Sequence, residues 1–493
     1  MDEQQYFDVI SPVNQEWIGK APILSKEQIQ EKIVCAKRAF PDWRASSFSE
    51  RRQILCTALD WIGKEKAELE KLIIKEVGKS LKNAESEMEC TIERIRQALV
   101  IAHVLLQEGG VRDGYSKSYY QGKYVVKKWE PLGVILIITP FDYPVFHVAS
   151  QIAEALLMGN TAVIKPSSNG TLTARYVAEL FYRAGVPEEV LQIVTGKGKK
   201  IGNILIKDPM IDCISFTGTT EVGRYIREQV SDIPLLMKLG GKDAAIVLED
   251  ADLELAAKHI VGNAFFYSGQ RHQAVKRVIA AESIHDVLTE KLLAYMEKLV
   301  MGNPKELNAD IVPLIHQESA DFVSELIEDA VRKGAVILTA GKGTQKSFPH
   351  RMQKHRVPEQ KRISTEYRQG NLLEPMLLDG ITNDMHLAWA EQLGPVLPVL
   401  TVKTGREAAT LVNQSEYSSG AILFSNSIEH ALHLAEQLKV DTVQINGKAE
   451  RRTGAFPYKG RKDLEIGISS DEVYSSMKAM AKLKKTMIHL TIR

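Results

Sequence analysis

The chain has 493 residues, of which 44% are hydrophobic and 25% charged, an ordinary composition for a folded globular protein. Its formal net charge is +1, so no global field favours nucleic acid or a membrane surface as a partner. It contains no run of about 18 apolar residues, and its acidic N-terminus lacks the apolar centre of a signal peptide. We therefore expect a cytoplasmic protein of two or three domains that does not span a membrane.

Residues 26–108 are predicted to be mainly helical, because apolar residues recur there at spacings of three and four. Helix starts are expected at Ser25 and near Ser49. Residues 119–129 alternate in polarity and carry basic side chains, which predicts an exposed strand of a hairpin. The continuous apolar run at 133–140 is typical of a strand that is buried on both faces of a parallel sheet.

Strands and helices alternate over the next hundred residues. We expect strands at 161–165, 191–194, 213–216 and 244–248, and helices at 148–158, 171–184 and 222–230. This rhythm predicts an α/β fold with a doubly wound sheet. The rhythm repeats from about 250 to 440, so a second α/β domain is expected.

The four cysteines lie far apart in the sequence. Cys35, Cys56, Cys90 and Cys213 form no C-x-x-C pair and no Cys/His metal pattern. We interpret them as reduced, buried thiols, and we expect no metal site.

A basic segment at 345–370 stands apart in composition. Its cations are Lys346, Arg351, Lys354, Arg356, Lys361, Arg362 and Arg368, against the acids Glu359 and Glu366. We interpret it as a solvated surface loop. The alternative is a loop that contacts an acidic partner; nucleic acid is the weaker option, because regularly spaced aromatic residues are missing.

Five short motifs follow one another in a specific order. They are T-P-F-D-Y-P at 139–144, N-T-A-V-I-K-P-S-S at 160–168, F-T-G-T-T-E-V-G-R at 216–224, L-G-G-K-D at 239–243 and E-Q-L-G-P-V-L-P at 391–398. Together they resemble the aldehyde dehydrogenase superfamily over essentially the whole chain. Residues 370–389 most resemble the non-phosphorylating, NADP-dependent glyceraldehyde-3-phosphate dehydrogenases of that superfamily.

The resemblance implies an aldehyde dehydrogenase-like fold of two doubly wound α/β domains with a small β extension for oligomerisation. We expect the nucleotide-binding domain at 1–114 and 133–248 and the catalytic-type domain at 249–445. The hairpin at 115–132 and the C-terminal segment at 470–493 would form the extension. A homodimer or homotetramer is the expected assembly.

Two residues near the end of the predicted strand at 161–165 indicate the cofactor. Lys165 ends that strand, and the resemblance implies that it binds the adenosine ribose. Relatives that prefer NAD often carry a glutamate at the position of Ser168. A carboxylate would repel a 2′-phosphate, whereas a hydroxyl can donate to it, so we expect NADP rather than NAD.

Other cofactor positions also match the family. Gly218, Thr219 and Gly223 match its turn and helix start near the pyrophosphate, where free amides attract anions. Glu391 matches the glutamate that binds the nicotinamide ribose. Leu393 replaces a phenylalanine that supports the nicotinamide. Read without the resemblance, the glycines could equally serve only the geometry of the fold.

The positions of the family's chemistry carry different residues here. His272 stands at the nucleophilic cysteine, Lys238 at the glutamate that activates water, and Asp142 at the asparagine that stabilises the oxyanion. A thiolate is lost, a base has become a cation, and a donor has become an anion that would repel developing negative charge. We predict that the usual thiol mechanism is absent.

We further hypothesise that Asp142, Lys238 and His272 pair with one another in a structural ion network. A Schiff-base role for Lys238 and a metal site at His272 and Asp142 are the minor alternatives.

Three residues match the substrate pocket of the triose-phosphate enzymes: Tyr143, Arg271 and Arg451. Guanidinium groups suit phosphate by bidentate hydrogen bonding, so a small phosphorylated aldehyde or related metabolite is the expected ligand. Each arginine could instead be an ion-paired structural residue.

Two functions remain open. The first is an NAD(P)-binding family member without aldehyde oxidation. The second is an active oxidoreductase on an aldehyde, or another activity in the altered pocket.

Overall fold

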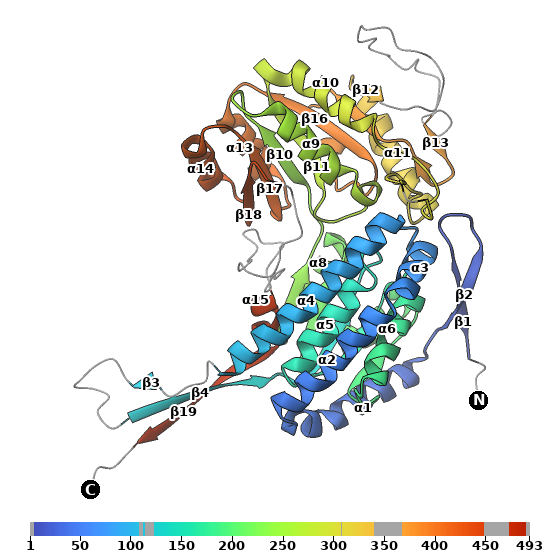
Figure 1. Ribbon diagram of the computed structural model, residues 1–493, viewed down its shortest axis with the longest axis vertical. Helices are drawn as coiled ribbons and strands as arrows, with labels where there is room; N and C mark the ends of the chain where they lie inside the picture. The colour runs from blue at the N-terminus through green and yellow to red at the C-terminus, as the bar shows by residue number, and fades with distance from the viewer. Residues whose placement is uncertain are drawn as a thin grey trace.

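The computed structural model describes residues 4–107, 112–113, 123–306, 308–339, 367–447 and 473–489. Two large sheets and their helices form the body of the molecule, and a narrow three-stranded sheet projects from it (Figure 1). The chain starts with an antiparallel hairpin, β1 (Tyr6–Ile10) and β2 (Trp17–Pro22), which runs along the edge of the body.

Four helices precede the first large sheet, as predicted. They are α1 (Lys26–Ala45), α2 (Phe48–Lys64), α3 (Lys66–Val77) and α4 (Leu81–Gln107). Ser25 caps α1 together with Gln28, and Ser47 caps α2 together with Glu50. The N-cap of α2 is therefore Ser47 rather than a residue near Ser49, because the capping box pairs Ser47 with Glu50, three residues later.

The first sheet has five parallel strands in the order β7-β6-β5-β8-β9. The strands are β5 (Val134–Ile138), β6 (Thr161–Lys165), β7 (Leu191–Ile193), β8 (Cys213–Thr217) and β9 (Leu235–Lys238). The helices between them are α5 (Phe146–Leu157), α6 (Thr171–Arg183), α7 (Gly198–Ile206) and α8 (Thr220–Gln229). The chain moves outward from β5 in both directions, so the order reverses between β5 and β8.

A buried ion pair fastens the helical layer to this sheet. Lys79 and Glu87 are both fully buried, and Lys79 Nζ lies 2.6 Å from Glu87 Oε2. The other oxygen, Glu87 Oε1, accepts hydrogen bonds from the amides of Val145 (2.8 Å) and Phe146 (3.0 Å) at the start of α5. Lys79 Nζ also lies 3.5 Å from the ring centroid of Tyr143. The backbone around residues 143–146 is therefore held independently of the neighbouring Asp142 side chain.

The second sheet has seven strands in the order β12-β15-β16-β11-β10-β17-β18, all parallel except β12. The strands are β10 (Asp243–Val247), β11 (Val275–Ala281), β12 (Val336–Thr339), β15 (Met376–Asp379), β16 (Val396–Val402), β17 (Gly420–Phe424) and β18 (Thr442–Ile445). Its helices are α9 (Leu253–Ala264), α10 (His285–Met296), α11 (Gln317–Arg332), α13 (Gly405–Gln414) and α14 (Ile428–Gln437), with 3-10 turns at Phe266–Gly269, Glu282–Ile284 and His386–Ala388. A small hairpin, β13 (Arg368–Gln369) and β14 (Leu372–Leu373), precedes β15.

One predicted boundary needs correction. β10 was assigned to the first domain, but it pairs with β11 and β17 and so belongs to the second sheet. The reason is that the chain crosses between the sheets at Leu239–Lys242, before this strand. The remaining domain limits stay predictions.

The projecting sheet has the order β19-β4-β3, with β19 (Ala481–His489) antiparallel to β4 (Lys123–Pro131) and β3 (Arg112–Asp113) on the other side. It extends away from the body, next to α15 (Val473–Ala479), whose Val473 and Met477 join the core of the first unit (Figure 1). The predicted strands in these two segments are confirmed. Among the described residues, no helix is both long and apolar enough to cross a bilayer.

Candidate functional site

A cavity of about 1180 Å³ opens at the carboxyl ends of β5, β6 and β8. Residues after all three strands line it: Thr139, Pro140 and Phe141; Lys165, Ser167, Ser168 and Asn169; Gly218 and Thr219. This is the point where the strand order of the first sheet reverses. Open α/β sheets bind their ligands at such a switch point, because two neighbouring loops diverge there. Lys165, Ser168, Gly218, Thr219 and His272 all line this one cavity, as the sequence predicted.

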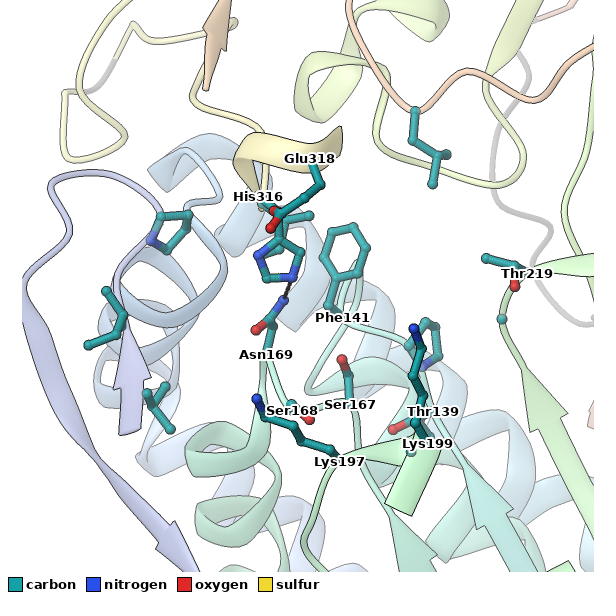
Figure 2. A pocket seen from close by; sticks show the side chains of 18 of the residues that line it. Thr139, Phe141, Ser167, Ser168, Asn169, Lys197, Lys199, Thr219, His316 and Glu318 are labelled. Atoms are coloured by element: carbon teal, nitrogen blue, oxygen red, sulfur yellow. Dashed lines mark hydrogen bonds between the residues drawn. The ribbon is translucent and has the colours of Figure 1, made fainter. Parts of the chain in front are cut away.

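One side of the cavity, here called the lysine end, is formed by Lys165, Lys197, Lys199 and Lys200. Lys165 is 7% exposed, and its Nζ donates to the carbonyl of Pro166 at 2.9 Å. Burial lowers the pKa of Lys165 to about 8. Lys197, Lys199, Ser168 and Phe141 all line this part of the cavity (Figure 2). Cations around the start of α7 suit a phosphate group.

The turn after β8 requires glycine for steric reasons. A Cβ at Gly218 would lie 2.6 Å from Phe216 Cζ, and a Cβ at Gly223 would lie 2.3 Å from Leu239 Cδ2. Gly223 thus lets α8 pack against the chain that leaves β9. Thr219 begins α8 without a side-chain capping bond, at the rim of the cavity. The steric role of these glycines is observed, and the same fold contacts bring the first amides of α8 to the cavity; their role in cofactor binding stays a prediction.

The opposite side, here called the histidine end, is formed by His272 and Leu393. His272 Nδ1 lies 3.1 Å from Glu391 Oε1, and the amide of Gly241 donates to the same oxygen at 3.0 Å. Burial alone would lower the pKa of His272, but the hydrogen bond and charge of Glu391, with a further contribution from Asp142, raise it. Burial would raise the pKa of Glu391, but His272, Lys276 and the Gly241 amide lower it. Both shifts favour a charged pair.

A strained turn positions His272. Tyr267 and Ser268 have positive φ values of 52° and 54°, a conformation that costs non-glycine residues on the order of 1–3 kcal/mol. Hydrogen bonds hold it: Ser268 Oγ exchanges two 2.8 Å bonds with the backbone of Val312, and Tyr267 Oη donates to Val77 O at 2.5 Å. None of these bonds involves the side chain at 272.

Asp142 is buried in the loop that follows β5. It is 4% exposed, and its Oδ1 lies 3.7 Å from His147 Nε2. Among the described residues, Oδ1 has no hydrogen-bond partner. Lys238 ends β9 and is half-buried.

The predicted network of Asp142, Lys238 and His272 stays a prediction. His272 pairs with Glu391, a partner that the sequence did not predict, and Asp142 lies beside His147. His272 and Glu391 are 119 residues apart in the sequence, and no local pattern joins them.

The expected substrate residues have structural contacts. Tyr143 is buried against Lys79. Arg271 Nη2 donates to Asn263 O at 2.9 Å, and its guanidinium lies 4.5 Å from the ring centroid of Phe266. Arg451 lies outside the described residues, as does the basic segment except for 367–370. Within the described ranges, no group of three or more His, Cys, Asp or Glu side chains is arranged to hold a metal ion.

A sequence profile described as the aldehyde dehydrogenase family matches residues 1–486. The chain belongs to the aldehyde dehydrogenase family. It is 39% identical over 485 residues to the NADP-dependent glyceraldehyde-3-phosphate dehydrogenase of Streptococcus equinus, covering 98% of this chain and 95% of the relative. It is 30% identical to the lactaldehyde dehydrogenase of Methanococcus maripaludis, covering 98% of this chain and 97% of that relative.

A solved structure agrees with this assignment. The NADP-dependent glyceraldehyde-3-phosphate dehydrogenase from Bacillus halodurans C-125, complexed with NADP, superposes with a TM-score of 0.90 at 38% identity. The match covers 99% of this chain and 96% of that one. The predicted aldehyde dehydrogenase fold is therefore confirmed.

Two features of this aldehyde dehydrogenase site were missed from the sequence. The lysines at 197, 199 and 200 lie in a Gly- and Lys-rich stretch with the composition of a loop. His316, in the loop before α11, meets Asn169 across the cavity through its Nε2 (Figure 2). Burial lowers the pKa of His316, although the charge of Glu318 acts in the opposite direction. The lowered pKa favours the neutral ring, whose Nε2 accepts from the Asn169 amide.

Proposed function

We propose that this chain is an NADP-binding member of the aldehyde dehydrogenase family that does not oxidise aldehydes through a thiol. The observation that carries the proposal is the position of the four cysteines. None of them lines the cavity, and the residue at its histidine end is His272, held by Glu391. Cys213 is fully buried in β8, and burial raises the pKa of its thiol far above neutrality. A thiol mechanism needs an accessible, low-pKa sulfur.

The charges around the histidine end also oppose the family's chemistry. Aldehyde attack develops negative charge on the carbonyl oxygen, which hydrogen-bond donors must stabilise. Asp142 instead brings a buried carboxylate whose Oδ1 has no donor among the described residues. His272, tied to Glu391, is favoured in its protonated form, which is not nucleophilic. These features support loss of the reaction even if an aldehyde enters.

Retention of NADP is supported by the lysine end. Lys165 is a buried cation whose nearest partner is a backbone carbonyl, and no carboxylate competes for it in the contacts of the described residues. Ser168, Lys197 and Lys199 line the same cavity and add a hydroxyl and two cations to its wall (Figure 2). The dehydrogenases of Streptococcus equinus and Bacillus halodurans are NADP-dependent by name. The residues present therefore fit NADP, which would supply a hydride acceptor wherever hydride is released.

The test compares binding with turnover. Calorimetry should detect NADP binding, while NADP reduction with glyceraldehyde 3-phosphate and a set of simple aldehydes should stay at the background rate. His272→Cys alone should also stay inactive, because Asp142 and Lys238 still oppose the chemistry. The matched variant is the triple replacement His272→Cys, Lys238→Glu and Asp142→Asn, for which measurable NADP reduction is expected.

The alternative is an active oxidoreductase on a phosphorylated aldehyde, or another activity in the altered pocket. Turnover by the natural chain that disappears in His272→Ala would establish this alternative and overturn the proposal. A signal that survives His272→Ala would point to a different catalytic residue.

We also propose a cytoplasmic homodimer or homotetramer. The projecting sheet exposes the apolar side chains of Leu483, Met487 and Ile488 on β19, which is its edge strand. Such an edge suits pairing with a second copy. Light scattering at micromolar concentration should give at least twice the monomer mass of 55.0 kDa.

A further inference from the structure

We propose that the cavity recognises its nucleotide through the phosphorylated adenosine half alone, because the carboxylate at the histidine end, Glu391, is already bonded to His272 and to the Gly241 amide. The ligand class is then any 2′-phosphorylated adenine nucleotide, whether or not it carries a nicotinamide and whatever the oxidation state of that ring. This inference rests on the proposed binding of NADP.

The carboxylate of Glu391 is bonded within the protein at the histidine end. Glu391 Oε1 accepts from His272 Nδ1 at 3.1 Å and from the Gly241 amide at 3.0 Å. Glu391 Oε2 faces the backbone, since a Cβ at Gly240 would lie only 2.0 Å from it. The carboxylate therefore lies against the backbone of residues 240–241.

The lining of the cavity agrees with this arrangement. His272 and Leu393 line the histidine end, whereas Glu391 is not among the lining residues and its side chain is 9% exposed. A sugar diol needs an accessible carboxylate oxygen to accept its two hydroxyl protons. A ligand would have to break the pair with His272 to obtain it, and this would leave a buried imidazole and a buried carboxylate without their partner.

The lysine end differs from the histidine end in the contacts of its charged groups. Lys165, Lys197, Lys199 and Lys200 line it, and the hydrogen bond of Lys165 goes to a neutral carbonyl. Charge-assisted bonds from ammonium groups to a phosphate dianion are stronger than bonds between neutral groups. The free energy of binding should therefore come almost entirely from this end.

The experiment is calorimetry of the full chain with four probes: NADP, NADPH, 2′,5′-ADP and NAD. We expect the first three dissociation constants to agree within about threefold, and NAD to bind at least about tenfold more weakly because it lacks the 2′-phosphate. His272→Ala should release Glu391 and tighten NADP at least about fivefold, with 2′,5′-ADP unchanged. In Glu391→Gln, NADP binding should stay as in the natural chain.

Each contrary result has one meaning. If NADP binds more than about tenfold tighter than 2′,5′-ADP and Glu391→Gln abolishes the difference, the inference is wrong while NADP binding stands. If no probe binds, the proposed function fails instead. Thermal unfolding of both variants with and without 2′,5′-ADP distinguishes a damaged fold from a changed preference, because a folded variant is still stabilised by this probe.

Discussion

Raising the pH from 7 to 9 should weaken NADP binding about tenfold, because Lys165 loses its proton over this range. Its pKa of about 8 in the ligand-free protein follows from burial beside a carbonyl rather than a carboxylate. At pH 7 about ten in eleven molecules carry the charge, and at pH 9 about one in eleven. A bound phosphate dianion raises this pKa, so the ligand selects the protonated form. The loss is then about tenfold, or about 1.4 kcal/mol.

Calorimetry in two buffers of different ionisation enthalpy measures this effect directly. At pH 8 the complex should take up about half a proton per site, since half of Lys165 is then deprotonated. The 2′-phosphate adds little, because a phosphate monoester has its second pKa near 6. Lys276 also has its pKa lowered to about 8 by burial, so Lys165→Gln is the necessary control. This variant should bind NADP weakly, and its affinity should not change between pH 7 and pH 9. A pH dependence equal to that of the natural chain would refute the assignment to Lys165.

Three further predictions concern stability, each measured by urea unfolding. Glu87→Gln should cost about 3–5 kcal/mol, because it leaves the buried ammonium group beside it without a counter-charge; a cost below about 1 kcal/mol would contradict a paired state. Gly223→Ala should destabilise by about 1–3 kcal/mol through its clash, whereas the matched helical change Gly202→Ala, with open space around it, should stabilise by about 0.5–1 kcal/mol. The pair of His272 with Glu391 should stabilise the natural chain over His272→Ala most fully below the unfolded histidine pKa of about 6.5 and above the unfolded glutamate pKa of about 4.5. The histidine contribution should disappear as the pH rises through the raised pKa of His272, and a difference that does not change between pH 6 and pH 9 would show that the pair is not charged.

The sequence predicted the sheets well where strands are apolar throughout. Val134–Ile137 is fully buried, and a continuous apolar run rich in β-branched residues is typical of a central parallel strand. It did not predict β9 or α7. Residues 235–238 are only four long and end in a lysine, and the start of α7 reads G-K-K, so neither segment shows a clear period. Tertiary packing, rather than local propensity, forms both elements.

The candidate site was likewise predicted only in part from the sequence. Motif spacing placed Lys165, Ser168, Gly218 and Thr219 on one cavity, because strands of one parallel sheet end at one edge, but it did not find the lysines at 197, 199 and 200. It could not predict which charged side chains pair there. The pairing of His272 with Glu391 depends on how the loop before β16 approaches the turn at 266–270.

The residues that hold the backbone of the site are not those that stand at the family's catalytic positions. The backbone can therefore persist when the side chains at those positions are replaced. The turn before His272 is stabilised by Ser268 and Tyr267, and the loop of Asp142 is anchored by Glu87 through the amides that follow it. None of these contacts uses the side chains at 142 or 272. Replacing a nucleophile or an oxyanion donor therefore removes little folding energy, and the pairing of His272 with Glu391 offsets part of what the buried charges cost. Close agreement in backbone geometry with the NADP-dependent dehydrogenase from Bacillus halodurans therefore does not separate loss of the thiol chemistry from its retention, and the ligand preferences of the two ends of the cavity are the more sensitive measure of what this chain does.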